Sequence, residues 1–287
     1  MIYFALSILM YLVQDFSNKS FCLKVGKTSF GTALIQNAVC CICSSLTLVV
    51  GGGVVMLQPS HMLLAALFGL SFLGTVFLLL CAFMHGTVGL STLICNIGMF
   101  VAAFYGIIRF GDGFTPFIAA GYVCMLIAVI LSSPIGVSER GGIKWFLLAL
   151  GSGISNGIVA SVKREAVGII ADDIQSFLAF GFLFAGLIAA VFAFSLKKCR
   201  EDVICVISSP KIMLFGVFAG IGGVMANLFQ MKSLVTLPST VVYPLTSGML
   251  VVILWLASVF IYKEAKIKPR NIAAIIFCLM AILFSNF

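Results

Sequence analysis

Long apolar runs separated by short polar breaks follow one another along the whole chain. Each run has about 18–24 residues, and about 20 residues of helix cross the hydrocarbon core of a bilayer. The runs are continuous, whereas a membrane β-barrel needs alternating segments of about ten residues. We therefore expect ten membrane-spanning helices, at about residues 2–20, 29–51, 62–84, 87–109, 115–133, 143–166, 174–196, 211–231, 239–261 and 268–286.

The composition indicates that lipid is the solvent for most of this chain. Hydrophobic residues make up 62% of its 287 positions and charged residues only 9%, against about 25% charged in soluble domains. The net charge of +8 lies in the short breaks, where it bears on topology and contact with anionic lipid rather than on nucleic acid. We expect an integral multi-pass protein, in the plasma (inner) membrane of a bacterium, with no nucleic-acid partner.

The metal-ligating residue types form no site in the sequence. Cysteines are scattered through apolar runs, and their one cluster, Cys40, Cys41 and Cys43, has neither His61 nor His85 nearby. A zinc site needs closely spaced nitrogen and sulfur ligands from at least two places. We expect no metal and no cofactor, and we interpret these cysteines as small residues packed between helices. The N-terminal run lacks a preceding Lys or Arg and a cleavage site, so it is interpreted as the first span.

One short phrase occurs twice, far apart in the chain. It consists of an acid, a proline four or five residues later, and an apolar run; the two copies begin at Asp112 and Glu264, with Pro116 and Pro269. Proline in the first turn of a helix costs no hydrogen bond, and an acid before a helix start faces the positive end of its dipole. We interpret Asp112 and Glu264 as structural turn and cap residues.

A five-helix unit used twice explains the repetition. Lys19 and Lys163 also match when the earlier parts of the two copies are aligned. An odd number of spans per unit forces the second copy to cross the membrane inverted, and inverted repeats with a site between them recur among transporters. The expected fold is all-α and polytopic, with one inverted five-helix repeat in residues 1–136 and the other in 137–287.

The second copy also resembles a known family. In "YPLTSGMLVVILWLASVFIYKEAKIKPRN", Pro244 and Glu264 sit where the drug/metabolite transporter superfamily, EamA type, usually has its proline and glutamate. In the first copy Thr92 lies near the proline position and Asp112 replaces the glutamate. The resemblance covers nearly the whole chain. It implies ten helices in two repeats around a central cavity and a secondary transporter, usually an exporter of metabolites, without naming a substrate.

The first run is similar to the small multidrug resistance proteins, the four-helix relatives of that family. The residues that carry this likeness are Ile2, Tyr3, Ile8, Leu9 and Lys19. The likeness implies proton coupling through a mid-helix glutamate, but the matching residues here are Tyr11 and, in the second copy, Ser155. Neither side chain can perform that role.

Amides and hydroxyls inside the apolar runs are the candidates for a substrate site. Any one of them can serve only to join helices, for roughly 0.6 kcal/mol, but as a set from both halves they suit a polar, uncharged or zwitterionic ligand. The residues that we expect to bind substrate are Tyr11, Gln14, Asn96, Asn156, Asn227, Tyr243 and Thr246.

Asp15 is the one acid well inside an early apolar run. A charge deep in the bilayer costs at least about 2.5–3.5 kcal/mol, so Asp15 must face a cavity, pair with Lys19 one turn away, or be protonated. It is the candidate coupling residue if it faces the cavity. Tight helix packing is expected at Gly153-x-x-x-Gly157 and Gly216-x-x-x-Gly220, because paired glycines let backbones approach.

These features favour a secondary-active transporter of a small polar metabolite, such as an amino acid, a sugar or a nucleoside, that works by alternating access. The expected partners are the small-molecule substrate and membrane lipid, and the chain is expected to act as a monomer. A small-multidrug-type cation exporter and a lipid-linked sugar flippase are the alternatives; a channel or structural membrane protein is less favoured. The sequence offers no catalytic constellation, so an enzyme is not expected.

The orientation rests on two opposing indications. Lys and Arg are concentrated in the breaks after the odd-numbered spans, and positive charge favours the cytoplasmic side. This distribution predicts that both termini lie outside, whereas many ten-helix relatives have cytoplasmic termini.

Overall fold

The computed structural model describes residues 2–25, 29–96, 98–113, 115–132, 142–263 and 268–284, and within these ranges the secondary structure is entirely helical. The helices are α1 (Ile2–Val25), α2 (Phe30–Val50), α3 (Pro59–His85), α4 (Val88–Cys95), α5 (Gly98–Phe110), α6 (Pro116–Ser132), α7 (Gly142–Ile169), the 3₁₀ turn η1 (Ala171–Asp173), α8 (Ile174–Ser195), α9 (Lys197–Ile207), α10 (Pro210–Leu234), α11 (Ser239–Phe260) and α12 (Pro269–Phe284).

Seven helical segments in the described part of the chain are long and apolar enough to cross a bilayer. They are α2, α3, the combined segment Leu90–Phe110, α7, the segment Ala171–Ser195, α10 and α11. The chain is therefore an integral, multi-pass membrane protein.

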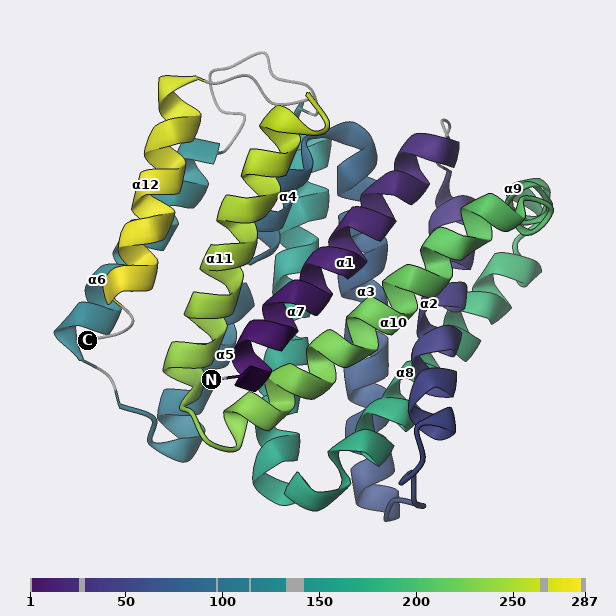
Figure 1. Ribbon diagram of the computed structural model, residues 1–287, viewed down its shortest axis with the longest axis horizontal. Helices are drawn as coiled ribbons and strands as arrows, with labels where there is room; N and C mark the ends of the chain where they lie inside the picture. The colour runs from purple at the N-terminus through teal and green to yellow at the C-terminus, as the bar shows by residue number, and fades with distance from the viewer. Residues whose placement is uncertain are drawn as a thin grey trace.

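The other three predicted spans differ from these seven in physical character. Helix α1 has 24 residues, but its second half carries Gln14, Asp15, Asn18 and Lys19, which lower its hydropathy. Helices α6 and α12 are apolar but short, at 17 and 16 residues. They lie side by side at one edge of the molecule (Figure 1).

Two details of the expected element pattern are wrong. The single helix expected over 87–109 is interrupted, because α4 ends at Cys95 and α5 begins at Gly98. The polar break after residue 196 contains helix α9, whose Cys199, Val203 and Val206 are buried. Spacings of four and three residues place these side chains on one helical face, so a segment that is polar on average still packs as an amphipathic helix.

Helices from the two halves of the chain are interleaved rather than separated. Helix α1 lies along α10, α3 along α7, α2 along α8 and α6 along α12 (Figure 1). The aromatic core crosses the same boundary, since the ring of Phe68 on α3 lies 5.3 Å from that of Phe177 and 5.4 Å from that of Phe182 on α8. Residues 1–136 and 137–287 thus share one hydrophobic core.

The two expected glycine pairs lie at close helix contacts, which confirms the packing prediction. A Cβ added at Gly157 would lie 2.8 Å from the carbonyl oxygen of Gly98 on α5, and one added at Gly220 would lie 2.5 Å from that of Cys40 on α2. Backbones this close leave no room for a larger side chain. Cys40 and Cys41 are fully buried in the same region.

Candidate functional site

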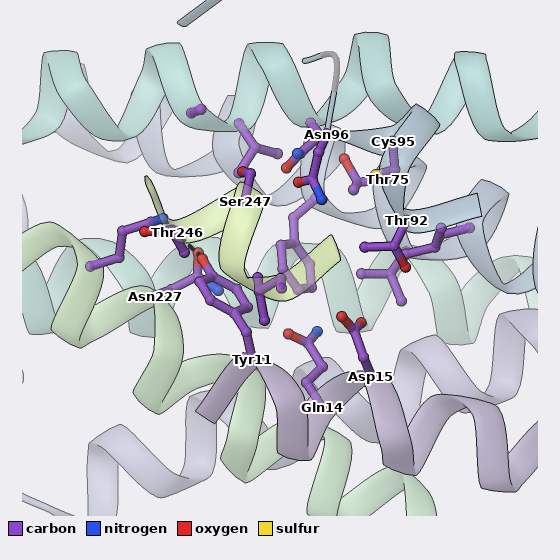
Figure 2. A pocket seen from close by; sticks show the side chains of 18 of the residues that line it. Tyr11, Gln14, Asp15, Thr75, Thr92, Cys95, Asn96, Asn227, Thr246 and Ser247 are labelled. Atoms are coloured by element: carbon purple, nitrogen blue, oxygen red, sulfur yellow. Dashed lines mark hydrogen bonds between the residues drawn. The ribbon is translucent and has the colours of Figure 1, made fainter. Parts of the chain in front are cut away.

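A central cavity lies between three helices of the first half, α1, α3 and α4, and three of the second, α7, α10 and α11 (Figure 2). The space that it leaves for water-sized molecules is about 90 Å³, so the cavity is narrow compared with the roughly 300–1,000 Å³ of typical small-molecule sites. Polar side chains from both halves point into it.

The structure brings the predicted site residues together around this one cavity. Its lining includes Tyr11, Gln14, Asp15, Asn96, Asn156, Asn227, Tyr243 and Thr246. Their role in binding a substrate stays a prediction. Of the two predicted turn residues, Asp112 is not in this lining, and Glu264 lies outside the described residues.

Lys163 on α7 is a cavity residue that is not among the predicted site residues. It is only 3% exposed, and its Nζ donates to Asn227 Oδ1 at 3.0 Å, to Tyr11 Oη at 3.3 Å and to Gln230 Oε1. The Tyr11 hydroxyl in turn lies 2.9 Å from Gln230 Oε1. The amine therefore joins α1, α7 and α10 through neutral oxygen atoms.

A signal for Lys163 was present in the sequence. It lies seven residues after Asn156, and residues seven apart on a helix share a face. The sequence repeat also aligns Lys163 with Lys19. The helix expected over 143–166 already includes Lys163, and α7 continues to Ile169, so Lys163 lies well inside the helix.

Asp15 lines the cavity. None of the described residues forms a hydrogen bond or an ion pair with it, and Figure 2 shows its carboxylate pointing inward from α1. Lys19 instead donates to the carbonyl oxygen of Phe83 at 3.4 Å. The alternative in which Asp15 pairs with Lys19 is therefore wrong, and the cavity-facing alternative describes its position.

Helix α4 contributes two buried polar atoms that lack partners among the described residues, Thr92 Oγ1 and Asn96 Nδ2. The two residues are one turn apart and both line the cavity (Figure 2). A buried donor left unpaired costs about 1–3 kcal/mol. This part of the wall is consequently ready to hydrogen-bond to a molecule inside the cavity.

Other cavity residues already have backbone partners. The Tyr243 hydroxyl donates to the carbonyl oxygen of Ala160 at 2.6 Å, which ties α11 to α7. The Thr246 hydroxyl donates to the carbonyl oxygen of Val242 at 2.7 Å on its own helix. These residues shape the cavity, and their hydroxyl protons are committed to the protein.

Asp112 caps a different helix from the expected one. It precedes α6, but its carboxylate accepts from the backbone N–H of Ser239 at 3.2 Å, at the start of α11, and from the Ser239 hydroxyl. It also pairs with Arg164 Nη2 at 3.0 Å. Burial by itself would raise the pKa of Asp112, but the hydrogen bonds from Ser239 and Arg164 outweigh it and hold that pKa below its ordinary value. The expected cap of α6 is thus corrected: the free N–H groups that attract Asp112 belong to α11.

No protein-family model matches the chain, and no curated protein matches it in sequence. Among solved structures 26 chains match. One of them, a crystal structure of a protein, has a TM-score of 0.52 and 12% sequence identity over 97% of this chain and 98% of that one. At this identity the likeness concerns the fold alone, and it extends over the whole helical arrangement.

Proposed function

We propose that the chain is a secondary-active transporter that exports a small polar metabolite through the central cavity by alternating access. The observation that carries this proposal is the cavity itself, which lies between the two halves and is lined with neutral amides and hydroxyls from three helices of each. A polar site between interleaved halves suits a solute that is taken from water on one side of the membrane and released into water on the other.

The proposed architecture is ten spans in two inverted five-helix repeats of the drug/metabolite transporter type. Reciprocal packing supports it: the first helix of each half lies along the third helix of the other, as α1 does with α10 and α7 with α3. The second helices, α2 and α8, pack on each other, and so do the fifth, α6 and α12. A two-fold axis in the membrane plane produces this exchange of partners.

Solute counterflow in proteoliposomes tests the proposed activity. Vesicles containing the purified protein are loaded with amino acids, sugars or nucleosides, and uptake of the labelled solute is compared with that of protein-free vesicles. We expect exchange for one of these classes, after a thermal-shift screen has chosen it, because ligand binding stabilises the folded state. Passage without counterflow would indicate a channel, and no passage of any solute would contradict transport.

A cation exporter is the second candidate, because the Asp15 carboxyl group faces the cavity without a hydrogen-bond partner among the described residues. In that case lipophilic cations such as tetraphenylphosphonium would exchange in the same vesicles, and Asp15→Asn would abolish the exchange. The metabolite proposal predicts that such cations do not exchange.

We further propose that both termini lie outside the cell, as the distribution of Lys and Arg favours. A reporter that fluoresces only in the cytoplasm, fused after Phe287, should then remain dark. A bright fusion would place the C-terminus inside and contradict this orientation.

A further inference from the structure

A buried polar cluster lies directly beside the cavity on α7. Arg164 follows the cavity residue Lys163 in sequence, and its guanidinium pairs with Asp112 at 3.0 Å; the two side chains are only 15% and 8% exposed. Asp112 also accepts the backbone N–H and the hydroxyl of Ser239. Asp112 belongs to the first half of the chain, whereas Arg164 and Ser239 belong to the second.

The surrounding contacts make this cluster compact. The Arg164 guanidinium lies 4.5 Å from the centre of the Phe110 ring, at the end of α5. A Cβ added at Gly106 would lie 2.2 Å from Ser239 Oγ and 2.7 Å from the Asp112 carboxylate. A side chain at position 106 would therefore have to displace the side chains of Ser239 and Asp112 from the cluster.

The cluster continues the cavity wall toward one end of the molecule. Tyr243 and Ala160, which line the cavity, join α11 to α7 by a hydrogen bond. One helical turn farther along the same two helices come Ser239 and Arg164. The cluster thus lies where α5 ends, α11 begins and α7 approaches its C-terminal end (Figure 1).

We propose that Asp112, Arg164 and Ser239 form the gate that closes this end of the cavity. The inference rests on the proposed alternating access, in which the halves must separate at each end in turn. Separation here requires the Arg164–Asp112 pair to break and the start of α11 to lose its cap. Because the two side chains are only 15% and 8% exposed, removing one of them leaves the other as a poorly solvated, uncompensated charge, which disfavours the closed state.

A second ion pair between the same helices provides the matched control. Arg109 on α5 lies 3.4 Å from Glu165 on α7, one residue after Arg164, but the Arg109 side chain is 61% exposed. An exposed pair contributes little because water and salt screen it. Removing the Arg109 charge should therefore leave the gate closed.

The native Cys95, which lines the cavity, reports opening without an introduced cysteine. In right-side-out and inside-out vesicles, a charged methanethiosulfonate reagent modifies accessible thiols, and mass spectrometry of the Cys95 peptide gives the rate. We expect Asp112→Asn and Arg164→Gln each to raise the Cys95 rate about tenfold or more, from one face of the membrane only. Arg109→Gln should stay within about twofold of the unaltered chain.

A double variant covers the case in which these substitutions prevent folding. In Asp112→Cys with Ser239→Cys, oxidation should join α11 to the α5–α6 turn, and the bridge is identified by mass spectrometry. Cys95 should then become inaccessible from the gate face, and a reducing agent should restore access. Unchanged Cys95 rates in folded Asp112→Asn and Arg164→Gln, or unimpeded access in the bridged protein, would overturn the gate.

This readout needs no substrate, so it separates the two proposals. If the variants open one face but no solute exchanges in counterflow, the gate stands and the transport proposal fails. If solute exchanges but the Cys95 rate does not respond, transport stands and the gate is wrong.

Discussion

The two walls of the cavity differ in how their polar groups are satisfied. On the α7–α10 side, the Lys163 amine is surrounded by the oxygen atoms of Tyr11, Asn227 and Gln230. On the α4 side, Thr92 and Asn96 keep buried polar atoms without partners among the described residues. A satisfied network fixes helix positions, whereas an unsatisfied wall stays available to a ligand. Residues with the same polarity can therefore serve structure on one side and recognition on the other.

The largest effect on stability is expected at Lys163. Lys163→Met would leave the oxygen atoms of Tyr11, Asn227 and Gln230 without this donor, and a buried polar group left unpaired costs about 1–3 kcal/mol. We expect a loss of roughly 3 kcal/mol in the free energy of unfolding, seen as a lower Tm in detergent. Lys211→Met, at an exposed position at the start of α10, is the control and should leave Tm nearly unchanged. Equal Tm values for both variants would contradict the claim that the Lys163 network stabilises the α7–α10 side of the cavity.

The opposite result is expected at Asn96. Its amide Nδ2 has no partner among the described residues, so Asn96→Ala should change the free energy of unfolding by less than about 0.5 kcal/mol. Counterflow should nevertheless fall about five- to tenfold, the value of one hydrogen bond to the transported molecule. Normal counterflow in this variant would show that Asn96 only joins helices.

Tyr243 should lie between these two cases. Tyr243→Phe removes the hydrogen bond to the carbonyl oxygen of Ala160, which we expect to cost about 1 kcal/mol of stability and to reduce counterflow, because that bond ties α11 to α7 beside the cavity. Tyr3→Phe, at a largely exposed tyrosine, is the matched control. If Tyr243→Phe is as stable and as active as Tyr3→Phe, the hydrogen bond from Tyr243 to Ala160 contributes to neither stability nor transport.

The smallest effect is the pH dependence at Asp112, which lies outside both walls. Its pKa is held below the ordinary value by Ser239 and Arg164, so its contribution to stability is present above the ordinary pKa, about 3.9, and is lost as pH falls toward the lowered one. The Tm difference between the unaltered chain and Asp112→Asn should stay constant from pH 8 to pH 5 and shrink only below about pH 4. A difference that already disappears near pH 6 would contradict the ion pair.

The sequence determined the helical, membrane-embedded character of the chain, because twenty-residue apolar runs have few stable alternatives in lipid. It also located eight of the polar residues that line the cavity, since polar atoms inside such runs are costly unless they face one another or a polar space. The interruption of the fourth span at Asn96 and the presence of α9 were not predicted, because average hydropathy records neither a local helix end nor a one-sided apolar stripe.

Only the tertiary structure decided which polar groups meet. Lys163 and Asp15 are both titratable residues inside helices, yet Lys163 is enclosed by oxygen atoms from α1 and α10, whereas Asp15 faces the cavity without a hydrogen-bond partner among the described residues. Asp112 precedes α6 in sequence but caps α11, because a carboxylate binds the free N–H groups and guanidinium that packing brings near it, wherever they lie in the chain. Partner choice among polar groups depends on distances of a few ångströms between helices, and linear spacing along one helix does not contain that information.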